Sequence, residues 1–499
     1  MHVLDAAIAD TRVLLGVGTL CYCLLVAYFT GQSRKLRHIP TTSPKAPLVS
    51  YLGAVRYVFS GKKFVEECLR KWPKSMFRAP DLVQWTVITT ERDLVAELLR
   101  APESTFSGRE SNDELMQMKY TLGAPITANP YHFPIIRNKL RRSLPNLVPD
   151  IYEELILAFE KYLPVNDDWT PIKFADVIPK ITCQASNRVL VGYPLCRDPD
   201  FMDLSVRFTF DIVTVAMILR SIPTFMRPLC NWLISSVPTQ QRKAVKYIGP
   251  LIDARRKERE LKGDDAQKPE DMITWLMDAA TDEETTNEAL SNRVLATFTH
   301  AIYYLASYPA YAQALREEVD MVVRNHGWSS LAIDSMVKVD SFIRESQRMN
   351  PLFNVGLSRL ALKDYTFSDG TFIPRGTTVS ANIHGPHFND TTYENPSTFD
   401  PNRFIKRTQK DDSDSDSARA RTTDITTTSN DFLAFGHGRH ACPGRYFAAS
   451  ELKLLMAYVV AHYDLKFEKE GERPADWWIM ASCLPNPKAE ILFRKRSTE

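Results

Sequence analysis

The chain has 499 residues, 44% of them hydrophobic, so it can bury a large core, and its length alone would allow two or three domains. The formal net charge is only +2, which argues against a protein that binds nucleic acid through its overall charge. The eight cysteines show no CxxC pair and no zinc-type spacing, so we expect reduced thiols that face the cytosol. They are Cys21, Cys23, Cys68, Cys183, Cys196, Cys230, Cys442 and Cys483.

The N-terminus is predicted to be a membrane anchor. Residues 13–30 form an uncharged apolar run of 18 residues, at the short end of what spans a bilayer. A basic flank follows at once and favours the cytoplasmic side for the rest of the chain. It comprises Arg34, Lys35, Arg37 and His38. Residues 1–38 are therefore expected to be an anchor with its flank. A cleaved signal peptide is the competing interpretation, which we disfavour because no small-residue cleavage site precedes a disulfide-rich chain.

Residues 39–47 are predicted to be a stiff hinge, because three prolines keep this stretch out of helix. The globular body begins near residue 48. It opens with α+β material, namely a helix over residues 64–70, an alternating strand over 84–89 and a helix over 91–100. Residues 107–134 are proline-interrupted and weakly periodic, which is typical of a loop that lines a pocket.

A basic helix is predicted to begin near residue 131. It carries Arg137, Lys139, Arg141 and Arg142. Each of these could belong to a solvated charged face, but together with Arg445 they could also form a basic docking surface. Residues 150–265 follow as successive helices with proline breaks at positions 164, 171, 179, 223, 228 and 238.

The next helices are predicted at residues 286–307, 310–324 and 335–349, the first opened by a capping box. The third contains Glu345 and Arg348, an i, i+3 pair that meets on one helical face and is usually a solvated salt bridge. Strands joined by Asp-Gly and Arg-Gly turns are predicted over residues 357–379. Residues 408–430 are a Ser-, Asp- and Thr-rich insert, expected to be a disordered surface loop.

The most informative stretch is residues 435–444, a glycine-punctuated loop with one cysteine that runs into an apolar helix over residues 445–462. Cys442 is a candidate metal ligand, because Pro443 suits a first helical position and the N–H groups behind it can face the sulfur. Gly436 and Gly438 allow a tight turn, and Gly444 removes a side chain beside the cysteine. Phe435 could shield the sulfur from water, and Arg439 and His440 could reach the anionic edge of a planar cofactor such as haem. A buried core cysteine is the alternative.

This loop resembles the haem-binding loop of the cytochrome P450 family, Phe-x-x-Gly-x-Arg/His-x-Cys-x-Gly, whose cysteine thiolate binds the iron. The residues Glu345-x-x-Arg348 resemble the family's Glu-x-x-Arg motif, and residues 400–404 resemble the segment that supplies a third member, Arg403. The resemblance covers about residues 13–495. It implies a mainly α fold with small β-sheets, preceded by an N-terminal transmembrane helix, with residues 48–499 forming a single haem-binding domain.

The resemblance also implies roles for single residues. Cys442 would be the axial ligand of haem b, and Arg137, Arg359 and His440 would hold its propionates. Phe435, Gly436 and Gly444 would complete the cofactor loop. Glu345, Arg348 and Arg403 would form a structural triad that holds this loop. Substrate contacts would come from residues 107–134, 352–357 and 482–485.

The implied function is a haem-thiolate monooxygenase that inserts one oxygen atom from O2 into a hydrophobic small molecule. Residues 363–371 and 387–390 are similar to fungal members, many of which oxidise terpenoids in secondary metabolism. Electrons would come from NADPH through a cytochrome P450 reductase, with cytochrome b5 as a second donor. The implied location is the endoplasmic reticulum membrane, crossed once, with the catalytic domain in the cytosol.

The distal helix that the resemblance implies departs from the family pattern. Family members carry a distal helix of roughly thirty residues with an oxygen-activating threonine, whereas the helix predicted at 286–307 spans 22 residues, about 33 Å. Thr285 and Thr286 fit the helix cap and not the oxygen-activating position within the helix. Together with the short helix, this indicates a deletion of about a dozen residues between Ala296 and Thr299, natural or from gene modelling. Two alternatives follow: a haem-thiolate isomerase or peroxide-using enzyme, and a catalytically silent haem protein.

Overall fold

The computed structural model describes residues 34–44, 49–81, 84–123, 132–266, 268–279, 306–405 and 424–496. The anchor predicted at 13–30 and most of the distal helix predicted at 286–307 lie outside these ranges. Within them, no helix is both long enough and apolar enough to cross a membrane.

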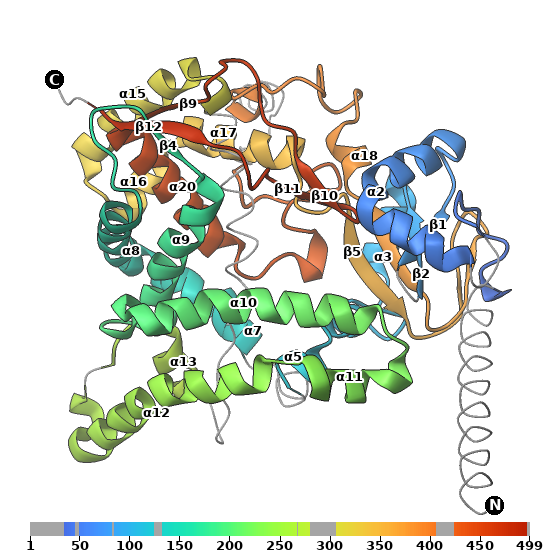
Figure 1. The fold of residues 1–499 in the computed structure, drawn as a ribbon, viewed down its shortest axis with the longest axis horizontal. Coiled ribbons are helices and arrows are strands. Elements are labelled where there is room, and N and C mark those ends of the chain that lie inside the picture. Colours follow the sequence, from blue (N-terminus) through green and yellow to red (C-terminus); the bar gives the residue numbers. More distant parts are fainter. Residues whose placement is uncertain are drawn as a thin grey trace, which may run out of the picture.

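The described chain is mainly helical with small sheets, which confirms the predicted fold class (Figure 1). The longer helices are α2 (Val49–Lys71), α8 (Arg141–Tyr162), α9 (Phe174–Leu190), α10 (Pro199–Arg220), α12 (Val237–Lys262), α15 (Ala310–His326), α17 (Val337–Met349) and α20 (Arg445–His462). The shorter ones are α3 (Arg92–Arg100), α4 (Gly108–Met116), α5 (Met118–Thr121), α7 (His132–Pro134), α11 (Arg227–Ile234), α13 (Met272–Ala279), α16 (Ser330–Ser335) and α18 (His384–His387). A π-helical stretch, η1 (Ile135–Leu140), joins α7 to α8, and 3-10 turns lie at η2 (Leu195–Arg197), η3 (Thr224–Met226), η4 (Gly263–Asp265) and η5 (Gly438–His440).

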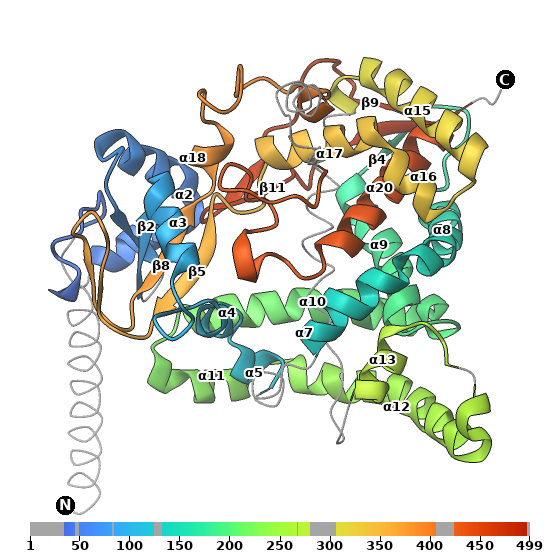
Figure 2. The same cartoon turned by 180° about the vertical axis from the view of Figure 1, so that it is seen from behind.

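The largest sheet has the strand order β1-β2-β8-β5-β3. Its strands are β1 (Phe77–Asp81), β2 (Gln84–Thr89), β8 (Thr378–Asn382), β5 (Val355–Ala361) and β3 (Phe106–Ser107). Only the β2–β8 pair is parallel, and the β5–β8 register shifts between Gly356 and Arg359. With α2 and α3 this sheet forms one end of the molecule (Figures 1 and 2).

Three small sheets complete the set of strands in the described ranges. β4 (Thr170–Ile172), β12 (Ile491–Lys495) and β9 (Tyr463–Lys466) form one, and β6 (Tyr365–Thr366) pairs with β7 (Phe372–Ile373). β10 (Trp477–Ile479) and β11 (Ser482–Leu484) form a hairpin. This hairpin contains most of the stretch 482–485, which the resemblance implies as a source of substrate contacts.

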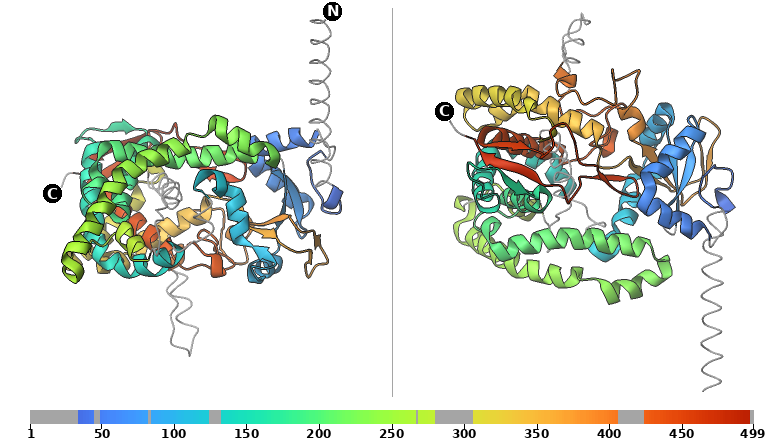
Figure 3. Two further views of the ribbon diagram at one scale, coloured as in Figure 1. Left: turned by 90° about the horizontal axis from the view of Figure 1, so that it is seen from below. Right: turned by 45° about the horizontal axis from the view of Figure 1, so that its top comes forward.

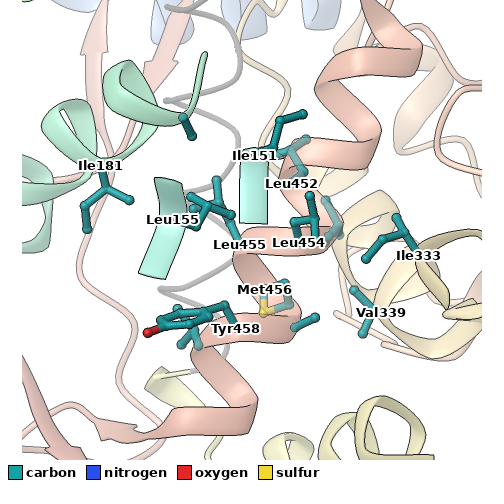
Figure 4. Close-up of a cluster of buried hydrophobic side chains, with 14 of the residues drawn as sticks. Ile151, Leu155, Ile181, Ile333, Val339, Leu452, Leu454, Leu455, Met456 and Tyr458 are labelled. Atoms are coloured by element: carbon teal, nitrogen blue, oxygen red, sulfur yellow. The ribbon is translucent and has the colours of Figure 1, made fainter. Parts of the chain in front are cut away.

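The main hydrophobic core surrounds α20. Thirteen of its 18 residues are buried, so this helix is enclosed on all sides, as its nearly uniform apolar sequence requires. Figure 4 shows Leu452, Leu454 and Leu455 of α20 among side chains from α8, α9, α16 and α17. The position of α20, and of the loop that leads into it, is therefore fixed by packing from several directions.

A separate layer of helices consists of α10, α11 and α12. α10 and α12 run side by side along one edge of the molecule (Figure 3). Their apolar side chains form a separate cluster with α5 and the residue that follows it, formed by Met118, Leu122, Ile212, Val215, Leu219 and Val237. Ion pairs fasten this layer to the rest: Arg220 to Asp81, and the buried Arg227 to Glu114 at 2.9 Å. On α12, Arg255 and Arg259 pair with Asp271 and Asp278.

Several predicted elements agree closely with the structure. The strand over 84–89 is β2, the helix over 91–100 is α3 with Glu91 as its N-cap, and the helix over 445–462 is α20. The six described cysteines are free thiols, as expected. These elements carry strong local patterns, which is why the sequence alone located them.

Three predictions were wrong. Residues 107–134 are not one loop, because the Ser107 hydroxyl accepts a hydrogen bond from the Glu110 N–H and opens α4. Pro179 lies inside α9 instead of breaking it, because the buried side chains around it offset a cost of about 3 kcal/mol. The insert at 408–430 ends earlier than predicted, since Ile425 is buried and its N–H donates to Asp340; its residues 408–423 lie outside the described ranges.

A buried acid on α20 gives the fold a pH dependence. Glu451 is fully buried and accepts a hydrogen bond from the Ser186 hydroxyl at 2.8 Å, and its other oxygen has no partner among the residues that the structure describes. Burial raises the pKa of Glu451 to about 8. In the unfolded chain the same carboxyl titrates near pH 4.3. The folded state therefore holds an extra proton between these values, and the free energy of unfolding falls as the pH rises through this window.

We predict that Glu451→Gln flattens this dependence. The amide has no charge to desolvate, so the variant should gain roughly 3–5 kcal/mol over the parent at about pH 9 relative to about pH 5. Thermal or denaturant unfolding of both proteins at the two pH values measures the difference. Glu317→Gln, on the exposed side of α15, is the control and should follow the parent. An equal pH dependence in parent and Glu451→Gln would contradict the assignment.

Candidate functional site

The loop over residues 435–444 closes upon itself before α20. Gly436 and Gly438 have φ of 74° and 68°, so both take the left-handed conformation that suits glycine. The Cys442 N–H donates to the Phe435 carbonyl at 2.8 Å, which joins the two ends of the turn. A methyl group on Gly436 would approach the Leu357 side chain to 3.2 Å. Phe435 is half-buried, and Gly444 is buried at the end of the loop.

Cys442 is 9% exposed, and its sulfur makes no hydrogen bond within the described residues. The sequence suggested Pro443 as the first residue of the helix. In the structure α20 begins at Arg445 with Gly444 as its N-cap, so Pro443 lies outside the helix. The Arg445 guanidinium turns back and donates to the Cys442 carbonyl at 3.0 Å. The cysteine therefore stands directly before the N-terminal end of a buried helix, whose free N–H groups carry partial positive charge.

A bulge in β5 brings Arg359 to this loop. Leu357 has a φ of 55°, unusual for a branched residue, at the point where the β5–β8 register shifts. Arg359 is 5% exposed, and its Nη1 donates to the Leu357 and Ser358 carbonyls. Its Nη2 is buried and has no partner among the described residues. Burial lowers the pKa of Arg359. A buried guanidinium with an unused donor fits an anionic group such as a haem propionate.

His440 lies beside Arg359 but already has a partner. Its Nε2 lies 2.9 Å from the Glu103 carboxylate. The pKa of Glu103 is lowered, because hydrogen bonds from the Ser107 hydroxyl and the Arg109 N–H outweigh its partial burial. The pKa of His440 is also lowered, first by its partial burial and then by Arg359. Sequence reasoning missed Glu103, which lies in a stretch without a motif; its acidic side chain balances the cations at this edge of the loop.

The basic helix lies on the outer side of the loop. Arg137 is exposed, and its guanidinium donates to the Arg439 carbonyl at 3.4 Å. The guanidinium groups of Arg141 and Arg445 lie 3.9 and 4.4 Å from the centre of the Tyr446 ring. The structure thus brings three of the predicted positive side chains, those of Arg137, Arg141 and Arg445, next to the cysteine loop.

Glu345, Arg348 and Arg403 meet in one buried network. Glu345 and Arg348 are completely buried and share two hydrogen bonds of 2.7 and 2.8 Å, so this pair is not a solvated surface bridge. The Arg403 Nε and the Asp400 N–H donate to the same carboxylate at 2.9 and 3.0 Å. Arg403 also donates to the carbonyls of Glu394 and Thr398. The network therefore holds residues 394–403 against α17.

Arg344, one residue before Glu345, was not singled out from the sequence. It is buried between the rings of Phe404 and Phe432, 4.4 and 4.3 Å away, and donates to the carbonyls of Asp424 and Thr427. It therefore holds the segment that leads into the cysteine loop. No local signal distinguishes it from a surface arginine, because its partners lie about 80 residues further along the chain.

The three segments expected to contact substrate begin next to one another. β3 and β5 pair through Ser107 and Leu360, and Gly108 packs on the Arg359 guanidinium. The hairpin β10–β11 joins the second segment, since the Cys483 N–H donates to the Leu352 carbonyl at 3.0 Å. Residues 124–131 lie outside the described ranges. Residues 107–108 thus lie beside the end of β5 that follows the bulge, and residues 482–485 lie beside residues 352–353 before it.

Comparison with known proteins covers nearly the whole chain. A family model described as Cytochrome P450 matches residues 40–493. Cytochrome P450 monooxygenase 151 of Postia placenta is 36% identical over 486 residues, which cover 94% of this chain and 96% of that protein. A cytochrome P450 monooxygenase of Ganoderma lucidum is 30% identical over 493 residues, with 95% and 96% covered. Ent-kaurene oxidase P450-4 of Gibberella fujikuroi is 29% identical over 491 residues, with 92% and 94% covered.

We predict that Arg348→Ala loses haem. The substitution leaves the buried Glu345 carboxylate with an incomplete set of partners, which costs about 3–5 kcal/mol, and it frees residues 384–403 from α17. Haem occupancy, measured as bound haem per protein chain, should collapse. Arg324→Ala, on the exposed face of α15, is the matched control and should load haem normally. Full occupancy in Arg348→Ala would show that the network does not hold the loop.

Proposed function

The chain belongs to the cytochrome P450 family, and we propose on this premise that it oxidises a terpenoid or a similar hydrophobic metabolite. It is an oxidoreductase of the monooxygenase type, as its relatives are named. Family membership implies a haem-thiolate iron. One observation carries the rest: a free, nearly buried cysteine stands directly before the buried helix α20, and its loop packs on β5, where the buried Arg359 has a donor that is unused among the described residues.

The residues present fit a haem. Cys442 would supply the axial thiolate, and Arg359 would take one propionate with its unused Nη2. Arg137 and His440 lie at the same edge of the loop and would contact the other carboxylate. When bound, the haem supplies activation of O2, which an electron-rich thiolate favours. Phe435 and the buried Ala441 limit the access of water to the sulfur.

A hydrophobic substrate is supported by the segments around the bulge. Leu352, Phe353 and Val355 lie in one of them, and the apolar cluster of α5, α10 and α12 lies in the neighbouring layer. The relative from Gibberella fujikuroi is named as an ent-kaurene oxidase, which favours a terpenoid among apolar substrates. The names of the relatives also favour a monooxygenase over an isomerase or a catalytically silent haem protein.

The electron donor is proposed to be an NADPH-dependent reductase, with cytochrome b5 as a second donor. Arg137, Lys139, Arg141 and Arg142 are exposed, and the first and third of them contact the residues around the cysteine loop, where an acidic partner would dock. Charge complementarity of this kind mainly accelerates association and is weakened by salt. The formal net charge of +2 shows that this basic character is local.

We predict that Cys442→Ala abolishes both the red-shifted Soret band of the reduced carbon monoxide complex and NADPH-driven product formation. The substitution removes the thiolate on which both depend. The assay combines the full chain, a reductase and a panel of terpenoids. Cys230→Ala, a thiol on α11 away from the loop, is the control and should keep both. A red-shifted band in Cys442→Ala would overturn the ligand assignment, and product formation by Cys442→Ala would overturn the mechanism.

We also propose that the chain is held at the endoplasmic reticulum membrane with its catalytic body in the cytosol. The apolar run at residues 13–30 with its basic flank supports this proposal. A second support is an exposed apolar surface on η3 and α11. It consists of Phe225, Leu229, Trp232, Leu233 and Ile234, and Trp232 is 77% exposed. Apolar patches of this kind mark surfaces that contact another protein or a membrane.

We predict that deletion of residues 1–38 leaves part of the protein on membranes, and that adding Trp232→Ser and Leu233→Ser releases it. The deletion removes the spanning segment, and the two substitutions remove apolar area from α11. Fractionation by ultracentrifugation measures the membrane-bound share. Leu261→Ser, an exposed leucine at the far end of α12, is the control added to the deletion. Complete release by the deletion alone, or protection of the whole body from protease in sealed microsomes, would contradict the proposal.

A further inference from the structure

We propose that His387 is a positioning residue that transmits the geometry of the buried charge network to the Cys442 loop. This inference rests on the proposed function and assigns a role to a residue that the sequence analysis names only within the stretch 387–390, which is similar to fungal members. His387 ends α18, is completely buried, and lies between α17 and the segment that leads into the loop.

Both ring nitrogens of His387 are used. The Leu433 N–H donates to Nε2 at 2.8 Å, and Nδ1 lies 3.2 Å from the Arg348 carbonyl. An amide N–H can only donate and a carbonyl can only accept, so Nε2 must carry the lone pair and Nδ1 the hydrogen. Burial lowers the pKa of His387 to about 3, so the ring is neutral and keeps this tautomer at physiological pH.

His387 and Arg348 hold each other in both directions. The Arg348 Nη1 donates to the His387 carbonyl at 2.7 Å, while the His387 ring donates to the Arg348 carbonyl. A shift of Arg348 must therefore move the ring as well as the backbone of α18. The ring is also stacked on Phe432, with centroids 5.3 Å apart and planes 14° apart.

Backbone hydrogen bonds connect Leu433, which His387 holds, to the loop that carries Cys442. The Leu433 carbonyl accepts from the Gly436 N–H at 2.9 Å, and the Cys442 N–H donates to the Phe435 carbonyl at 2.8 Å. Gly436 and Gly438 have no side chains that could fix the loop, and the far end of the loop is held by α20. The amide of Leu433 is thus one point at which the start of the loop is fixed, in addition to the Thr428–His437 hydrogen bond, and His387 is its acceptor.

The test replaces each ring nitrogen separately in the full chain. In His387→Gln the amide oxygen can reach the place of Nε2 and accept from Leu433. In His387→Asn the shorter amide reaches only the place of Nδ1, so the Leu433 N–H loses its acceptor. Phe432→Leu removes the stacking partner but leaves both hydrogen bonds. His384→Asn changes the neighbouring histidine, which stacks on Phe388 and has no bond to the loop.

The first readout is the spectrum of the haem-loaded fraction, as the ratio of the red-shifted to the unshifted Soret band of the reduced carbon monoxide complex. In His387→Asn the buried Leu433 N–H has no acceptor, which destabilises the parent conformation of the Cys442 loop. The ratio of the two Soret bands should therefore change by roughly tenfold. The ratio should stay close to that of the parent in His387→Gln, Phe432→Leu and His384→Asn. If His387 had a purely structural role, both His387 variants would load less haem by the same amount. The band ratio of the fraction that still holds haem would not change.

The second readout does not need haem. Amide hydrogen exchange over residues 432–442 should be several-fold faster in His387→Asn than in His387→Gln or His384→Asn. Equal exchange and equal band ratios in the two His387 variants would overturn the role of His387, as would a Phe432→Leu variant that behaves like His387→Asn. A parent protein without a red-shifted band would instead contradict the proposed function, while the exchange measurement would still decide the role of His387.

Discussion

The buried carboxylate of Glu345 is the constraint on which the cysteine side of this protein depends. A charge with no exposure to water is tolerated only when donors surround it, and here Arg348, Arg403 and the Asp400 N–H do so. Because these donors come from α17 and from a segment some 55 residues later, their convergence fixes the path of the chain between them. The segment that leads into the Cys442 loop is tied to this network through His387, which binds Arg348 and accepts from the Leu433 N–H, and the loop ends on α20, which the main core encloses. Polar and apolar constraints thus act on opposite ends of one short loop.

The parts of the fold that the sequence predicted well have strong local signals. The alternating pattern of β2, the apolar run of α20 and the glycine spacing before Cys442 each depend on neighbours within a few residues. The same holds for Glu345 and Arg348, whose spacing places them on one helical face. Their burial does not follow from spacing, because an identical pair on an exposed helix would be a surface bridge. The resemblance to a family, not periodicity, placed Arg403 with them.

The parts that the sequence missed depend on distant partners. Glu103 is recognised as a site residue only once β3 and the cysteine loop are side by side, and Arg344 only once residues 424–432 fold over it. Pro179 was taken as a helix break because its local cost is real, but the packing of Phe174, Ile178 and Ile181 outweighs that cost. The positive φ of Leu357 and the bulge in β5 leave no trace in the sequence, although they bring Arg359 to the loop. In each case tertiary packing overrides the local preference.

The apolar cluster of α5, α10 and α12 is separate from the core around α20. It shares no buried member with the core around α20, and the two are joined by other elements. Substitutions in groups that share no partners add nearly independently in their effect on stability. Changes to Met118, Ile212 or Val215 can therefore reshape that layer while the cysteine side keeps its stability. An architecture divided in this way lets the destabilisation caused by substitutions in one cluster stay separate from the stability of the other.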